Sequence, residues 1–171
     1  MIKVKLTTYD YDPSIKERFP EYTPNLSKKW EGFEFFLNEK IDKCDYWVVF
    51  DHLPQKESTV CSKKNIIFIT GESSSIKKYN QKFLNQFSHI ITCQRRIKHP
   101  QVHYMAPGHS WFSKKSYDEL ISNDKIEKNK LISIVVSNKS GTPGHKKRLD
   151  FCLNLKKYFG DKIDIFGRGI N

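Results

Sequence analysis

The sequence lacks the long apolar runs and paired cysteines that would assign it at once to a membrane or metal-binding class. No stretch of about 18 apolar residues occurs, so no transmembrane helix is predicted. The first residues alternate apolar and charged side chains and lack the apolar core of a signal peptide. No C-x-x-C pair occurs among Cys44, Cys61, Cys93 and Cys152. We therefore expect a cytoplasmic protein, with Cys93 and Cys152 as buried free thiols.

Several catalytic motifs are also missing. Neither G-x-x-x-x-G-K-[ST] nor G-x-G-x-x-G occurs, which excludes the two common glycine-rich phosphate-binding loops. No Ser-His-Asp arrangement is recognisable. His99, His103 and His109 are close in sequence, but Pro100 interrupts the helix that would bring the first two together. The sequence therefore predicts no bound metal and no cofactor.

The chain is poor in arginine, yet its formal net charge is +11. Such a charge favours anionic partners, namely nucleic acid, a membrane surface or phosphorylated small molecules. The lysines are spread along the whole chain, and no block of like charges stands out. This distribution is typical of a lysine-rich solvated surface. We therefore predict no specific nucleic-acid partner, while peripheral contact with a membrane stays open.

Short apolar runs recur along the first part of the chain and predict strands. They cover residues 2–8, 46–50, 65–70, 88–93 and 102–105. An amphipathic helix is predicted over residues 76–87, where apolar side chains recur at spacings of three and four. Residues 14–45 are compatible with either a helix or a strand. Strands that alternate with helical connections indicate a parallel α/β sheet.

A new β-α-β unit is predicted near the end of the sequence. Its strands cover residues 131–136 and 163–166, and its helix covers residues 146–159. Residues 107–130 interrupt the pattern with Pro-Gly and polar stretches, which is typical of a linker. We therefore expect a Rossmann-like domain over residues 1–106, the linker, and the first β-α-β unit of a second Rossmann-like domain over residues 131–171.

One carboxylate lies directly after the apolar run Ile66–Ile69. Thr70-Gly71 ends that run, and Glu72 and three serines follow. A side chain just beyond the carboxyl end of a buried strand lies where open α/β sheets bind their ligands. Glu72 is therefore our candidate general base. The alternative is a solvated glutamate in a serine-rich turn.

A second candidate site is the loop 137–145, which precedes the predicted helix 146–159. Backbone N–H groups at the amino terminus of a helix suit a phosphate. Lys146, Lys147 and Arg148 stand in the first turns, where cations are unfavourable unless an anion lies nearby. The alternative is an ordinary polar loop.

Taken in order, these segments resemble glycosyltransferase family 10, the α-1,3/α-1,4-fucosyltransferases and their relatives. The resemblance covers about residues 60–171, and residues 1–59 fit only as a generic α/β unit. It is carried by Phe68–Ser74, Phe87–Thr92, His109–Trp111, Ser137-Asn-Lys with His145–Phe151, and Ile163–Arg168. Some relatives have proline or asparagine soon after the Thr-Gly-Glu turn, where this chain has serines.

The resemblance implies a GT-B fold, with the site between two Rossmann-like domains, and an inverting, metal-independent transferase. Fucose would pass from GDP-fucose to a hydroxyl of a glycan acceptor, with Glu72 taking the proton. Arg148 matches the basic residue that binds the donor diphosphate. The further donor-binding candidates are Lys147, Ser137 and Asn138, and the acceptor-side candidates are Asp51, His52 and Ser73.

The donor-domain region that relatives carry after Gly167-Arg168 is not part of this sequence. We therefore expect a fragment or truncated product with little or no activity alone. Two other functions stay open: a basic α/β module that binds nucleic acid, and a related transferase that uses another nucleotide sugar. A nucleic-acid module would bind with an affinity that falls steeply with salt and does not depend on Glu72.

Overall fold

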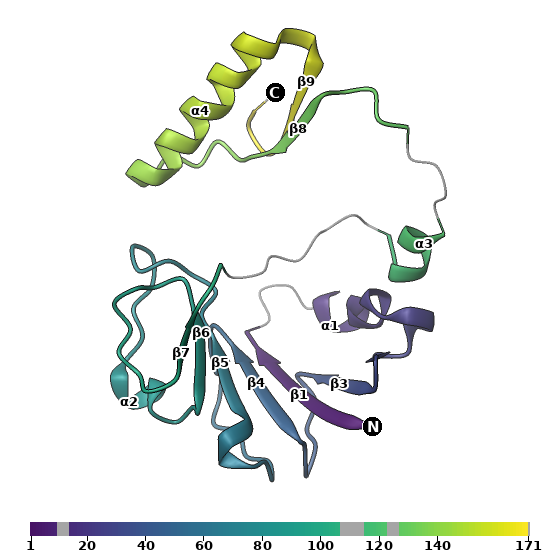
Figure 1. The fold of residues 1–171 in the computed structure, drawn as a ribbon, viewed down its shortest axis with the longest axis vertical. Coiled ribbons are helices and arrows are strands. Elements are labelled where there is room, and N and C mark those ends of the chain that lie inside the picture. Colours follow the sequence, from purple (N-terminus) through teal and green to yellow (C-terminus); the bar gives the residue numbers. More distant parts are fainter. Residues whose placement is uncertain (10–13, 107–114, 123–126, 171) are drawn as a thin grey trace. The chain divides into compact units, whose positions relative to one another are not determined.

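The computed structural model describes residues 1–9, 14–106, 115–122 and 127–170. The chain divides into two compact units, Met1–Asn123 and Asp124–Asn171, and Figure 1 shows the elements of each. The boundary falls inside the stretch 107–130 that was predicted as a linker.

The first unit is built on a seven-stranded sheet in the order β2-β3-β1-β4-β5-β6-β7 (Figure 1). Neighbouring strands pair in parallel, except for the antiparallel pair β2 and β3. The strands are β1 (Ile2–Thr8), β2 (Lys29–Trp30), β3 (Phe33–Leu37), β4 (Tyr46–Phe50), β5 (Ile66–Ile69), β6 (His89–Thr92) and β7 (Val102–Tyr104). The predicted α/β class with a mostly parallel sheet is confirmed.

The strand order reverses beside β1. The chain passes from β1 to β3 on one side and then to β4 on the other side of β1. In a parallel sheet such a reversal leaves a crevice outside the carboxyl ends of the two adjacent strands. Here those strands end at Thr8 and Phe50, so the residues that follow them flank the crevice.

Helical segments cover both faces of this sheet. They are α1 (Ser14–Arg18), η1 (Phe19–Tyr22) and η2 (Pro24–Leu26) on one face, and α2 (Gln81–Leu84) on the other. Phe19 of η1 meets Phe35 of β3 with ring centroids 6.5 Å apart, whereas Phe83 of α2 meets Phe68 of β5 at 5.2 Å. The strand register places Phe35 and Phe68 on opposite faces, because side chains alternate along each strand. We call the side of Phe68 the α2 face.

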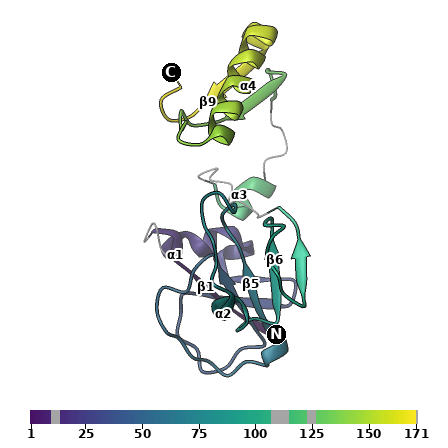
Figure 2. The ribbon, with the colours of Figure 1, turned by 90° about the vertical axis from the view of Figure 1, so that its left-hand side faces the viewer.

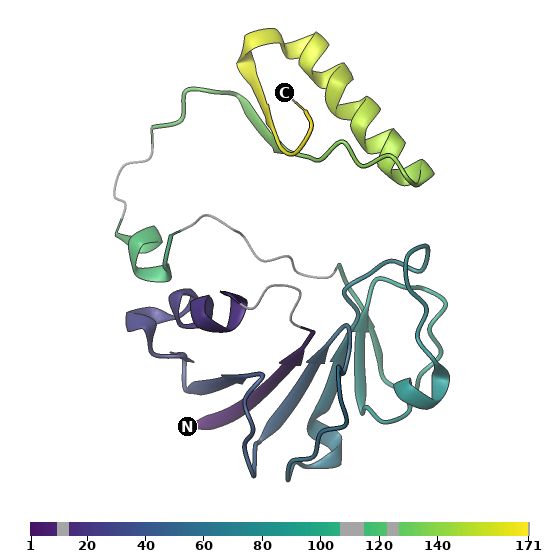
Figure 3. The same cartoon turned by 180° about the vertical axis from the view of Figure 1, so that it is seen from behind.

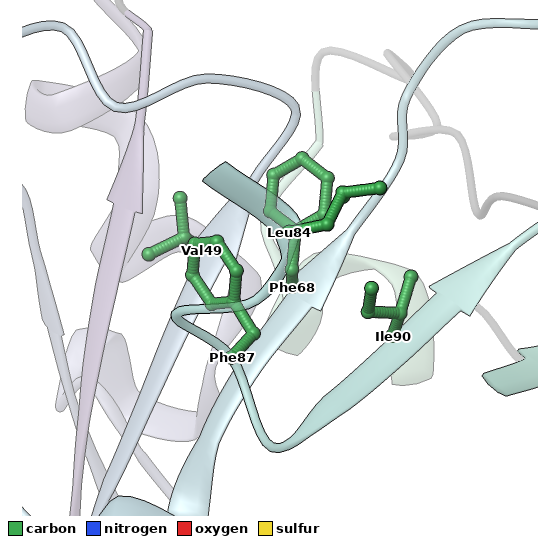
Figure 4. Close-up of a cluster of buried hydrophobic side chains, with 5 residues drawn as sticks. All are labelled: Val49, Phe68, Leu84, Phe87 and Ile90. Carbon is green, nitrogen blue, oxygen red and sulfur yellow. The ribbon is translucent and has the colours of Figure 1, made fainter. Parts of the chain in front are cut away.

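The main hydrophobic core lies on the α2 face. Figure 4 shows its buried members, each at most 7% exposed: Val49, Phe68, Leu84, Phe87 and Ile90. Burying one such side chain contributes about 1.5–3 kcal/mol. Because the cluster joins β4, β5 and β6 to α2, it fixes the carboxyl ends of these three strands relative to one another.

The predicted helix 76–87 is wrong for most of its length. Only α2 is helical, because Asn80 caps the helix by accepting a hydrogen bond from Lys82 N–H. Residues 74–76 form a turn, and residues 77–79 have no regular secondary structure. Their Lys77 and Tyr79 side chains bond to Asp51, after β4, rather than lying along a helix.

A loop connects β4 to β5. Residues 51–62 cross without a helix (Figure 2), and the 3-10 turn η3 (Lys63–Asn65) directly precedes β5. The loop 51–62 therefore takes the place of the helix that usually connects two parallel strands.

The four cysteines are free. Cys152 is buried, as expected, whereas Cys93 was expected to be buried and is half-buried.

Helix α3 (Tyr117–Ile121) lies within the predicted linker but belongs to the first unit. Asp118 Oδ2 accepts a hydrogen bond from Asn25 N–H at 2.8 Å. The rings of Tyr117 and Trp30 lie 5.9 Å apart. Residues 107–114 and 123–126 of the linker lie outside the described residues.

The second unit is a single β-α-β motif. Strands β8 (Ile132–Val135) and β9 (Ile163–Phe166) pair in parallel, and α4 (Pro143–Phe159) runs beside them (Figure 3). Cys152 of α4 and Ile163 of β9 are buried. The helix begins at Pro143 rather than at Lys146, because Thr142 caps it by accepting a hydrogen bond from His145 N–H.

Candidate functional site

The carboxyl ends of β4, β5 and β6 meet at one edge of the sheet and carry many polar side chains. Four of these residues are at most 6% exposed: Asp51, Thr70, Thr92 and Gln94. Thr70 Oγ1 donates to Thr92 Oγ1 at 2.8 Å, and Thr92 Oγ1 also accepts from Gln94 N–H at 2.9 Å. Buried polar groups need such partners, and here the partners join neighbouring strands.

Asp51 is the centre of this network. Its Oδ1 accepts hydrogen bonds from Gly71 N–H at 3.1 Å and from the Tyr79 hydroxyl. Its Oδ2 accepts from Lys77 Nζ at 2.9 Å, and the same ammonium donates to the Asp51 carbonyl at 2.8 Å. Both oxygens of the buried carboxylate are therefore occupied by groups of this chain.

Burial and hydrogen bonding act in opposite directions on Asp51. Burial raises the pKa of its carboxyl, but the hydrogen bonds from Tyr79, Lys77 and Gly71 outweigh burial and hold the pKa below its usual value. The pKa of the Tyr79 hydroxyl is raised well above its usual value. Burial is the largest cause, and the hydrogen bond to Asp51 is the second. At neutral pH, Asp51 is therefore a charged acceptor and Tyr79 a neutral donor.

Glu72 is fixed through its backbone, while its side chain is exposed. Its carbonyl accepts a hydrogen bond from Gln94 Nε2 at 2.8 Å, and Gln94 Nε2 also donates to the Lys77 carbonyl at 3.1 Å. Gly71, directly before it, is bonded to Asp51. Within the described part of the chain, the Glu72 carboxylate has no hydrogen-bond or ion-pair partner. A free carboxylate thus leaves the sheet from a fixed point.

The acceptor-side candidates differ in their surroundings. Asp51 is buried in the network described above. His52 is exposed, and its ring meets Tyr9 with ring centroids 5.6 Å apart. Ser73 is exposed, with its Oγ 2.8 Å from Ser75 Oγ. The structure therefore brings Asp51 against the backbone of Gly71, directly before Glu72. His52 instead contacts Tyr9, which follows β1.

Sequence reasoning missed three residues of this network, namely Lys77, Tyr79 and Gln94. The first two were assigned to a helix on the basis of their spacing. Gln94 lies two residues after the end of β6, and Asp51 lies directly after the end of β4. This position near a strand end was a usable signal. All three act on the backbone or on Asp51 rather than exposing a reactive group.

The donor-binding candidates lie around the loop after β8 and the start of α4. Ser137 is half-buried, and Asn138, Lys147 and Arg148 are exposed. Asn138 N–H donates to the Arg168 carbonyl at 3.1 Å, which joins the loop after β8 to the turn after β9. The first turn of α4 contains no acidic side chain. The helix dipole and the nearby cations therefore both favour an anion here.

Gly167 allows these two loops to approach each other. Its φ is 138°, and a Cβ at this position would overlap the Val136 carbonyl oxygen. We expect Gly167→Ala to destabilise the second unit by about 2–3 kcal/mol, because backbone strain and steric overlap add. Hydrogen exchange of the β8 and β9 amides measures the loss. Gly141→Ala is the control, since a Cβ there meets nothing within 4 Å, and equal protection in both variants would refute the prediction.

The histidines do not converge. His99 Nε2 lies 3.0 Å from the Phe87 carbonyl, whereas His103 Nε2 lies 3.2 Å from His89 Nδ1. His109 lies outside the described residues. In the ranges that the structure describes, no group of three or more metal-ligating side chains could hold a metal ion. In the same ranges, no helix has the length and apolar character needed to cross a membrane.

Comparison of the chain with known protein families, with curated proteins and with solved structures found no match.

Proposed function

We propose that this chain belongs to an inverting glycosyltransferase in which Glu72 is the general base. The observation that carries the proposal is the contrast between two carboxylates at one sheet edge. Both oxygens of Asp51 are bonded within the chain, whereas Glu72 is exposed on a fixed backbone. A general base must reach the proton that it removes, and of these two side chains Glu72 is free to do so.

In the proposed reaction, a hydroxyl oxygen of a glycan acceptor attacks the anomeric carbon of a nucleotide sugar. The bond from that carbon to the diphosphate oxygen breaks, and the configuration inverts. Glu72 takes the hydroxyl proton, which makes the attacking oxygen a better nucleophile. The departing nucleoside diphosphate carries the negative charge away and is stabilised by fixed positive charge.

The proposed donor is GDP-fucose, and the second unit supplies its contacts. The resemblance to family 10 supports the choice of donor. The acid-free start of α4 and the exposed Lys147 and Arg148 support the choice of an anionic ligand. Ser137 and Asn138 offer a hydroxyl and an amide on the adjacent loop. We propose that this unit is the start of the donor domain of a GT-B fold.

Arg148→Ala is expected to weaken GDP-fucose binding by about tenfold or more, because a charge-assisted hydrogen bond to phosphate is lost. Ligand-observed NMR of the chain with GDP-fucose measures this change, with UDP-glucose and a short oligonucleotide as comparison ligands. Lys157→Ala is the matched control, since it removes an exposed cation from the last turn of the same helix.

The comparison ligands separate the alternatives. GDP-fucose signals that saturate with wild type and are lost with Arg148→Ala support the donor site. Preference for UDP-glucose would indicate a transferase with another donor. Binding of the oligonucleotide alone, abolished by salt, would indicate a nucleic-acid module instead.

A further inference from the structure

A cavity of about 1120 Å³ lies beside the point where the strand order of the first unit reverses. Its walls include Thr8 and Tyr9 at the end of β1, and Pro54 and Gln55 in the loop 51–62. Ligands of parallel α/β sheets bind at such reversal points. Single small molecules usually occupy about 300–1,000 Å³, so this cavity has room for a ligand of several linked rings.

The cavity has a buried polar floor. Lys5 of β1 lies on the α2 face with only 3% of its side chain exposed. Its Nζ lies 3.0 Å from Glu57 Oε2 and donates to the Glu39 carbonyl at 2.6 Å. Thr7 Oγ1 donates to the same Glu57 oxygen at 3.4 Å and accepts from Trp47 Nε1 at 3.0 Å. Burying a lysine on a sheet is costly unless it is paired. An ordered polar floor beneath open space points to a polar ligand.

Among the described residues, the charges that line this cavity are balanced, although the chain as a whole carries +11. These residues are three lysines and three carboxylates: Lys5, Lys40, Lys56, Glu39, Asp42 and Glu57. The carboxylates disfavour a phosphate or a nucleic acid, and the lysines disfavour a cation. Mixed donors and acceptors without net charge match a neutral ligand rich in hydroxyl groups.

Tyr9 and Asn38 add the remaining features of a carbohydrate site. Tyr9 provides an aromatic surface on which the apolar face of a sugar ring can pack. Asn38 Oδ1 accepts from Thr8 N–H at 2.9 Å, which orients the amide and leaves its NH₂ group as a donor for a ligand. Both residues follow the carboxyl ends of parallel strands, at the same sheet edge from which Glu72 leaves β5.

We propose that this cavity binds a neutral oligosaccharide and forms the acceptor-side subsite of the transferase. The role of the glycan as acceptor rests on the proposed function, whereas carbohydrate binding itself does not. Glu57 and Asn38 supply hydrogen bonds to the sugar hydroxyls, the buried Lys5 holds Glu57 in place, and the loop 51–62 closes one side.

Amide chemical-shift titration of the chain tests the proposal with lactose, N-acetyllactosamine, maltotriose and chitotriose as probes. At least one probe is expected to give saturable shifts at Thr8, Asn38 and Glu57. Ser58→Trp, which fills the cavity from an exposed wall position, weakens that binding by about tenfold or more. Ser62→Trp is the matched control on the same loop, exposed and outside the cavity lining, and binds as wild type does.

Three results would overturn the proposal: no shifts with any probe at millimolar concentration, shifts confined to other residues, or equal binding by the two tryptophan variants. The dispersion of the amide spectrum shows whether Ser58→Trp is folded, and Gln55→Trp provides a second filled cavity if it is not. A transfer assay of Glu72→Gln tests the proposed function separately. Oligosaccharide binding with transfer that does not depend on Glu72 would retain this site and refute the catalytic proposal.

Discussion

Replacing Glu72 by glutamine is expected to lower the rate of GDP-fucose-dependent transfer by about 10²–10⁴-fold, the usual contribution of a general base. Glutamine has the same shape but cannot accept the proton. The Glu72 carboxylate has no hydrogen-bond or ion-pair partner among the described residues, so the exchange breaks no bond within the chain. We therefore expect the free energy of unfolding to change by less than about 0.5 kcal/mol. Loss of activity without loss of stability is the combination that identifies the base.

The matched control is Glu31→Gln, which changes an exposed glutamate in the turn between β2 and β3. Because we expect little transfer by this chain alone, initial transfer rates are measured with a complete donor domain joined to it. Urea unfolding is measured on the same preparations. We expect Glu31→Gln to match wild type in both. Transfer by Glu72→Gln at the wild-type rate would remove Glu72 from the mechanism, and a large loss of stability would mean that its carboxylate has a structural role instead.

Every strand except β2 and β3 could be predicted, because each is a local signal. The strands β2 and β3 lie in residues 14–45, for which helix and strand were both left open. The run predicted over residues 65–70 became β5 at Ile66–Ile69, and the other runs agree to within one or two residues at their ends. The helix over residues 76–87 could not be predicted correctly. Ile76 has helical spacing but is 53% exposed, because Lys77 and Tyr79 bond to a residue that is distant in sequence. A tertiary contact of this kind leaves no periodic pattern.

The same distinction applies to the candidate site. The positions of Asp51 and Glu72 after buried strands could be read from the sequence, since the carboxyl ends of parallel strands share one edge. The different states of the two carboxylates could not be read. Asp51 is buried because Gly71, Lys77 and Tyr79 converge on it, and Glu72 is free because Gln94 holds only its carbonyl.

Asp51→Asn is expected to lower the free energy of unfolding by about 3 kcal/mol at neutral pH. The substitution removes the charge that Lys77 and Tyr79 bond to and places an amide NH₂ group among buried donors. Urea unfolding at several pH values measures the loss. Asp42→Asn is the control, because Asp42 is exposed and we expect its replacement to change stability by less than about 0.5 kcal/mol.

The pH dependence distinguishes a charge effect from a packing effect. The pKa of Asp51 is lower in the folded chain than its usual value, so its charge stabilises the fold above the unfolded pKa of about 4. That contribution is lost as the pH falls through the lower, folded pKa. The stability difference between wild type and Asp51→Asn should therefore be constant near neutrality and shrink in acid. A difference that does not change with pH would mean that the Asp51 charge contributes nothing, and that the hydrophobic cluster around Phe68 alone fixes the edge from which Glu72 leaves.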